Sequence, residues 1–162
     1  MGRIYSIPYS GTLTAAGGDA DLCSIQPADD KPCQIIGFDL GQTSELGDAA
    51  EENIRLTVRH LAATVTIGSG GSAVTPVGER PGTSLAAGFT ARCNDTTVAT
   101  TTGANTIATE GAWNERNTPF EKWIPENQRK TAVQGEALVL RNESTVADDI
   151  SINLTVWVEE FG

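Results

Sequence analysis

The feature that most constrains this fold is an unbroken alternation near the end of the chain. Apolar residues occupy every second position from Ile150 to Val158, and more polar residues, with Trp157 among them, fill the positions between. Successive side chains of a β-strand point to opposite faces, so five apolar residues at a period of two share one face only in a strand. The pattern therefore predicts a strand over 150–158 that buries Ile152, Leu154 and Val156.

Two earlier runs, 34–41 and 53–60, show the same period and predict two further strands with one buried face each. Their inward positions are Ile36, Phe38, Leu40, Ile54, Leu56 and Val58. The acidic connection 42–52 is too polar for a core, so we expect a surface loop. A single helical turn at Asp48–Glu52, capped by Asp48, is compatible with its sequence.

Strand-like runs recur along the whole chain, and no helical pattern exceeds two turns. Because long crossover helices are missing, parallel βαβ units are excluded. We expect one domain over 1–162, folded as an all-β antiparallel sandwich of about nine or ten strands, jelly-roll-like and with long loops. Residues 1–14, in which Pro8 lacks a backbone donor, predict an edge strand or an extended N-terminal arm. The continuous apolar run 137–140 predicts burial on both faces.

The segment 68–84 is rich in Gly and Pro and has almost nothing to bury. Structureless loops longer than ~12–15 residues are uncommon in compact domains and are usually functional or disordered. Two interpretations stay open. The segment is either an arm that becomes ordered against a neighbouring subunit or a mobile loop.

The charge of the chain limits its partners. Asp and Glu outnumber Lys and Arg, and the formal net charge is −10. Such a surface repels the phosphates of nucleic acids and of anionic membranes, so neither is an expected partner. The first residues lack the apolar core of a signal peptide, and no apolar run approaches the ~20 residues of a membrane span. We therefore expect a protein that is made in the cytoplasm.

No constellation of residues predicts an enzyme. His60 is the only histidine, and its place at the end of a strand favours a surface or packing role. The cysteines Cys23, Cys33 and Cys93 lack the spacing of a zinc site, and we expect no metal and no cofactor. The favoured interpretation is three buried thiols; a disulfide between Cys23 and Cys33 is the alternative.

The aromatic residues allow two interpretations. Trp113, Phe120 and Trp123 form a cluster along the sequence that would suit stacking on sugar rings. Trp157 lies on the polar parity of the last predicted strand. It either packs under a loop of its own chain or belongs to a contact surface, since aromatic residues are enriched at interface cores.

Five blocks carry a resemblance: PADDKP at 27–32, LGQTSELGDAAEE at 40–52, GSGGSAVTP at 68–76, AGFTA at 87–91 and WVEE at 157–160. Together they resemble a family of small structural proteins of tailed bacteriophages, and the likeness covers most of the chain. The resemblance implies a decoration, or cement, protein on the exterior of the capsid, made in the host cytoplasm. It further implies binding to the major capsid protein and assembly as a homotrimer.

On this interpretation the contacts come from the N-terminal arm, the Gly/Pro-rich segment and the last strand. The candidate contact residues are Arg3, Tyr5, Tyr9, Ser69, Val74, Pro76, Arg80, Pro81 and Trp157. The alternative function is a glycan- or receptor-binding module of a phage head fibre or tail, with the aromatic cluster as its platform. A hydrolase is a third hypothesis, for which the sequence singles out no pair of carboxylates.

Overall fold

The computed structural model describes residues 2–14, 17–43, 52–80, 85–116 and 119–162. These residues form strands almost throughout, with one short 3-10 helix, η1 (Glu126–Gln128). The long strands are β1 (Arg3–Leu13), β2 (Ala20–Pro27), β3 (Cys33–Gln42), β4 (Asn53–Leu61), β8 (Phe89–Asp95), β10 (Asn105–Asn114), β13 (Ala137–Asn142) and β14 (Ile150–Glu160). The short strands are β5 (Val65–Thr66), β6 (Ser72–Val74), β7 (Val77–Gly78), β9 (Thr100–Thr101), β11 (Phe120–Trp123) and β12 (Thr131–Ala132).

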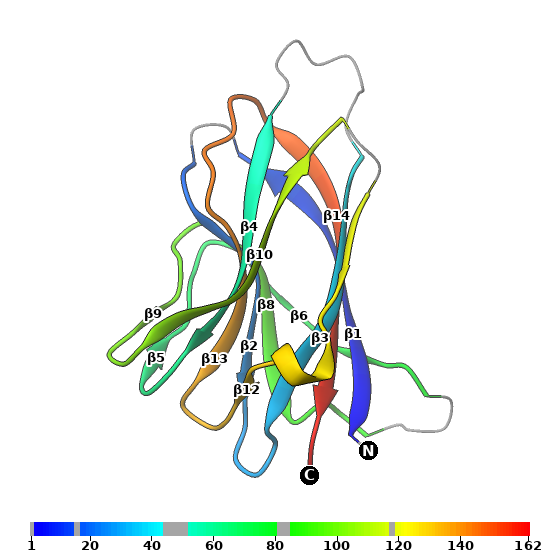
Figure 1. Ribbon diagram of the computed structural model, residues 1–162, viewed down its shortest axis with the longest axis vertical. Coiled ribbons are helices and arrows are strands. Elements are labelled where there is room, and N and C mark those ends of the chain that lie inside the picture. The colour runs from blue at the N-terminus through cyan, green and yellow to red at the C-terminus, as the bar shows by residue number, and fades with distance from the viewer. Residues whose placement is uncertain (1, 15–16, 44–51, 81–84, 117–118) are drawn as a thin grey trace.

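Two six-stranded sheets form the body of the molecule (Figure 1). Sheet A has the order β11-β3-β14-β1-β7, with β12 also paired to β3. Sheet B has the order β10-β4-β13-β2-β8-β6, and β5 pairs with β9 in a small third sheet. The pairings are antiparallel, so the expected all-β antiparallel sandwich is confirmed.

The first four long strands alternate between the two sheets. β1 and β3 lie in sheet A, while β2 and β4 lie in sheet B. The chain crosses again from β10 in sheet B to β11 in sheet A, and from β13 in sheet B to β14 in sheet A. Repeated crossing of this kind is typical of double-sheet jelly rolls. The jelly-roll connectivity stays a prediction that the alternation supports.

The core lies between the two sheets and takes residues from both. The inward side chains of β14, from Ile150 to Val158, are at most 2% exposed, which confirms the strand predicted from the alternation. β13 is buried on both faces, also as predicted. Leu138 and Leu140 point into the main core, whereas Ala137 and Val139 belong to a second apolar cluster with Leu61 and Ala99.

A bulge in β3 corrects one expected side-chain direction. Trp157 pairs with Gly37, but Val158 pairs with Ile35, so Ile36 is the additional residue. Ile35 belongs to the main core and Ile36 does not. Ile36 is buried, as expected, but it lies outside the main core that contains Phe38, because the bulge shifts the parity of the strand between them.

The N-terminal residues form a strand rather than an arm. β1 pairs with β14 along its entire length, from Arg3 opposite Glu160 to Leu13 opposite Ile150. On its other side, the described residues pair with it at two positions, Tyr5 and Ser6, both opposite β7. The prediction of an extended arm is therefore wrong. The other interpretation, an edge strand, is nearly right, because the short strand β7 follows β1 at the end of sheet A.

The Gly/Pro-rich segment is not structureless over its described part, residues 68–80. Ser69 forms a β-bridge with Thr97, β6 adds to β8 at the edge of sheet B, and β7 reaches across to β1 of sheet A. The long loop expected over 68–84 is corrected accordingly, because short strands need few apolar residues when they extend existing sheets. Residues 81–84 lie outside the described residues.

The turn expected at Asp48–Glu52 also lies outside the described residues, except for Glu52. Among the residues that the structure describes, η1 is the only helix, and it has neither the length nor the apolar character that crossing a bilayer takes.

Candidate functional site

Two tryptophans meet on the outer face of sheet A. Trp157 of β14 and Trp123 of β11 both lie opposite Gly37 of β3, one from each side. Their rings stack with centroids 4.8 Å apart and an angle of 29° between the planes. A Cβ atom on Gly37 would lie 2.5 Å from Cε3 of Trp123, so the absence of a side chain there makes room for the stack.

The tryptophan pair is accessible to a partner. Trp123 is 52% exposed, and its indole N–H donates a hydrogen bond to the Glu121 carboxylate. Nearby, Arg129 forms an ion pair with Glu159 at 3.6 Å. A large aromatic surface with polar groups around it is the composition of an interface centre. We call the surface formed by Trp123, Trp157 and Gly37 the tryptophan platform.

Of the contact residues predicted from sequence, only Trp157 belongs to this platform. Tyr5 is 3% exposed, stacks edge-on against Phe89 and donates its hydroxyl to the Leu85 carbonyl at 3.3 Å. It is a core residue and offers little surface for a contact. Arg3 lies 3.8 Å from the buried carboxylate of Glu160, and Tyr9 packs partly against the main core.

The predicted contact residues of the Gly/Pro-rich segment lie apart from the platform. Val74 and Pro76 line a hollow of about 260 Å³ beside the start of β8. Ser69 is exposed at its bridge to Thr97, and Arg80 is exposed as well. Pro81 lies outside the described residues. The structure thus distributes the eight described contact residues over several places and does not bring them together in one site.

The aromatic cluster expected from sequence is divided. Trp113 is 2% exposed and belongs to the main core. Phe120 packs against that core and lies 5.9 Å from the Phe38 ring, between centroids. Only Trp123 faces outward, and its partner is Trp157. The outward parity of Trp157 was the one sequence signal for this pair, because the register that sets Trp123 and Trp157 on the two sides of Gly37 leaves no trace in the sequence.

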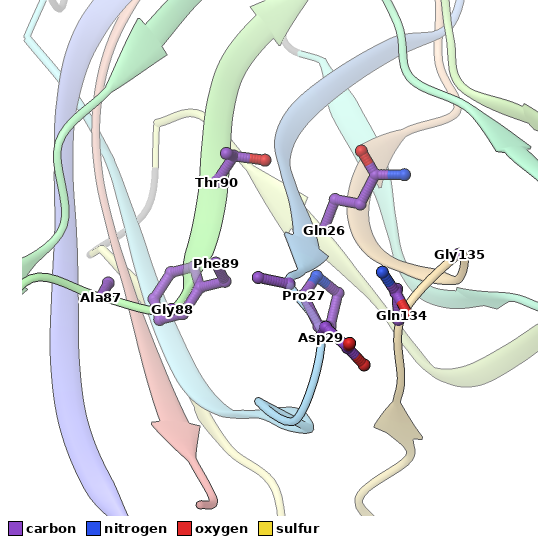
Figure 2. Close-up of a pocket in the computed structure, with 10 residues that line it drawn as sticks. Gln26, Pro27, Asp29, Ala87, Gly88, Phe89, Thr90, Gln134 and Gly135 are labelled. Atoms are coloured by element: carbon purple, nitrogen blue, oxygen red, sulfur yellow. The ribbon is translucent and has the colours of Figure 1, made fainter.

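A second candidate site is a hollow of about 400 Å³ where β2 ends and β8 begins. Figure 2 shows Gln26 and Thr90 at one end of it, Gln134 and Asp29 farther along, and Pro27 between them. Gln26 pairs with Thr90 and Pro27 with Phe89 across the two strands. The Ala28 N–H donates to the Gly88 carbonyl at 2.8 Å, which holds the two chain segments together beneath the hollow.

Two fully buried carboxylates, Asp21 and Asp95, lie opposite each other on β2 and β8. Asp21 accepts hydrogen bonds from Arg141 Nε and from the Ala99 N–H, both at 2.6 Å. Burial raises the pKa of Asp21, and these two hydrogen bonds oppose the rise. Asp95 accepts from Arg92 and, at 2.9 Å, from the Gly71 N–H. Through these contacts both acids tie loops to sheet B, which is a structural role.

The three cysteines are free and buried, so the interpretation as buried thiols is confirmed and the disulfide between Cys23 and Cys33 is wrong. Cys23 instead lies opposite Cys93. A hydrogen bond with Cys93 and burial raise the pKa of Cys23 well above its ordinary value. Burial, with a smaller effect of Glu160, raises the pKa of Cys33 to about 12. Thiols in these states are poor nucleophiles, because the thiolate is the reactive form.

His60 forms a contact of 2.9 Å between its Nε2 and the Glu136 carboxylate, which gives it the packing role expected from sequence. Within the described part of the chain, no group of three or more His, Cys, Asp or Glu residues has an arrangement that suits a metal ion. Comparisons with protein-family models, with curated proteins and with solved structures found no match to this chain.

Proposed function

We propose that the protein is a structural component of a bacteriophage virion that binds the outer surface of the major capsid protein lattice and stabilises the head. The proposal starts from the resemblance of five sequence blocks to small phage virion proteins. The single structural observation that supports it is the tryptophan platform. A stacked pair with Trp123 52% exposed, on the outer face of a sheet, is a large apolar surface that a partner protein can cover.

The mechanism in this proposal is passive. A copy that contacts several capsid subunits at once favours the assembled shell over free subunits, because its binding free energy is available only in the assembled state. Assembly of the decoration protein as a homotrimer multiplies these contacts. The net charge of −10 favours capsid surfaces that are neutral or basic around the tryptophan contact.

The test uses capsids assembled with and without the protein. We expect particle reconstructions to place it on the outside of the shell. Trp123→Ala and Trp157→Ala should lower its incorporation about tenfold or more, since interface tryptophans often contribute 2 kcal/mol or more to binding. Their melting temperatures should stay close to that of the unmodified protein, because the platform lies outside the core.

The matched control is Ile107→Ala, which removes an apolar side chain that is 39% exposed on β10 of sheet B. This variant should be incorporated normally. The proposal fails if the protein is found inside the shell or not on it at all. If Trp123→Ala and Ile107→Ala are incorporated equally well, the tryptophan platform is not part of the contact with the capsid.

The alternative function, a glycan- or receptor-binding module, keeps one observation in its favour. The expected three-residue aromatic cluster does not form a platform, because Trp113 is buried in the core. The exposed ring of Trp123 stacked on Trp157 remains a surface on which a sugar ring can stack. A glycan array separates the two functions: binding that Trp123→Ala abolishes, with normal particles in the absence of the protein, favours the alternative.

A further inference from the structure

We infer that the hollow between the end of β2 and the start of β8 binds a neutral saccharide unit. This inference goes beyond the virion role and does not depend on it. The hollow is distinct from the tryptophan platform and is built from three separate segments. Its lining consists of Gln26, Pro27, Ala28, Asp29, Ala87, Gly88, Phe89, Thr90, Gln134 and Gly135.

The size and the framework of the hollow suit a small ligand. Its volume of about 400 Å³ falls in the range of small-molecule sites, roughly 300–1,000 Å³. Two of its walls are held by paired strands, with Gln26 opposite Thr90 and Pro27 opposite Phe89. The third wall is the turn from β12 to β13, where Gly135 has a left-handed φ of 85° and Glu136 N–H donates to Val133 O at 3.0 Å. Such a site is formed before the ligand arrives.

The polar groups of the hollow are uncommitted. Among the described residues, the side chains of Gln26, Asp29, Thr90 and Gln134 have no hydrogen-bond partner within the protein, and the last three are exposed to solvent. Each amide offers donors and an acceptor, the hydroxyl offers both, and the carboxylate only accepts. Figure 2 shows these four side chains around one space, with Pro27 and Phe89 beside it. Several convergent donors and acceptors over an apolar base match the alternating hydroxyl and C–H groups of a pyranose ring.

Charge decides against anionic ligands. None of the ten lining residues is Lys or Arg, one of them is Asp29, and the whole chain carries −10. This balance disfavours a phosphate, a sulfate or an acidic sugar. The Lys31 side chain, which lies against Gly88, is the cation next to the lining. A purely apolar ligand would displace water from four polar side chains and offer them no hydrogen bond in return, which is unfavourable. A neutral ligand that is rich in hydroxyl groups satisfies both constraints.

The experiment is saturation-transfer NMR and calorimetry on the full chain with a panel of neutral monosaccharides and disaccharides, with glucuronic acid as the anionic comparison. We expect at least one neutral sugar to bind with a dissociation constant of about 1 mM, typical of a small polar site, and glucuronic acid to bind more weakly. Gln134→Ala should weaken binding about threefold to tenfold, the effect of one lost hydrogen bond. Gln26→Ala should weaken it by a similar factor.

The matched control is Gln128→Ala, an exposed glutamine in η1 outside the hollow, which should bind like the unmodified protein. Gln134 is exposed in a turn, so its substitution tests the site even where Gln26→Ala lowers the melting temperature. The inference is overturned if no neutral sugar in the panel binds at about 10 mM. It is also overturned if binding survives Gln26→Ala and Gln134→Ala but is lost in Trp123→Ala, since the sugar then occupies the tryptophan platform.

Discussion

Neighbouring residues of β14 have opposite environments. Leu154 is 2% exposed and packs in the core between the sheets, whereas Thr155, on the outer face, is half-buried. The Thr155 backbone N–H donates to the Asp39 carboxylate at 2.9 Å, a contact that does not use its side chain. The two residues therefore separate the effect of the core from the effect of the outer face within a single strand.

We expect Leu154→Ala to lower the free energy of unfolding by ~2–5 kcal/mol, the usual loss of transfer free energy plus the cost of the cavity. Thr155→Ala should lower it by less than ~1 kcal/mol, since surface substitutions have small effects. Chemical denaturation of the two purified variants measures both values. Equal destabilisation would contradict the one-sided burial of β14.

One pair of residue contacts, between β2 and β8, has a signal in the sequence besides the alternation of apolar and polar residues. The segments Asp21-Leu-Cys23 and Cys93-Asn-Asp95 carry the same two end residues in reverse order. In an antiparallel pair such segments place like residues opposite each other, and here Asp21 lies opposite Asp95 and Cys23 opposite Cys93. The stack of Trp123 on Trp157 had no comparable signal, because it depends on the register of β3 with two other strands.

At the scale of elements, the success of prediction followed the length and regularity of the pattern. β14 and β4 were predictable because each repeats an apolar residue at every second position over a long run. β7 was not, because a two-residue strand has no period and forms only by joining a partner that is already in place. The bulge at Ile36 was missed for a related reason. The strand pairing is regular before and after it, so the sequence pattern does not show the additional residue.

One further element-scale feature is a charged cluster on the outer face of sheet B. Glu143 follows β13 and accepts hydrogen bonds from Thr57 and Arg59 of β4, both at 2.6 Å, and from Arg55 at 2.8 Å. Burial tends to raise the pKa of Glu143, but the hydrogen bonds from Thr57 and Arg59 and the charges of Arg59 and Arg55 outweigh it. The pKa is therefore below its ordinary value of 4.5.

The sign of the resulting pH dependence follows from this shift. A carboxyl group whose pKa is lower in the folded state stabilises the fold above its unfolded pKa, and this contribution is lost as the pH falls through the folded pKa. We expect Glu143→Gln to lower the free energy of unfolding at about pH 7, with a smaller difference from the unmodified protein at about pH 3. Urea titrations at both pH values measure the difference.

The control for this prediction is Glu126→Gln, an exposed acid in η1, which should have little effect at either pH. A difference between Glu143→Gln and the unmodified protein that grows toward low pH would have the wrong sign. It would show that the arginine contacts do not hold Glu143 ionised.

For the whole molecule, the expectation of a homotrimer follows from the resemblance and stays a prediction. Each copy has a formal net charge of −10, so copies repel one another at low ionic strength. We expect light scattering to give about three times the chain mass of 17.0 kDa, with the trimer fraction rising when salt screens the repulsion. A strict monomer at all salt concentrations, together with isolated copies on the particle, would contradict it.

The row of Trp157, Gly37 and Trp123 spans three strands of sheet A, and it gives the protein an optical reporter of its own state. The two stacked indoles form one emitting pair that is sensitive to whatever covers Trp123. Trp113, buried in the core, senses only the integrity of the sandwich. A single fluorescence spectrum thus contains an outer probe and an inner reference. Occupancy of the outer face can be followed in real time, without a label, and distinguished from unfolding.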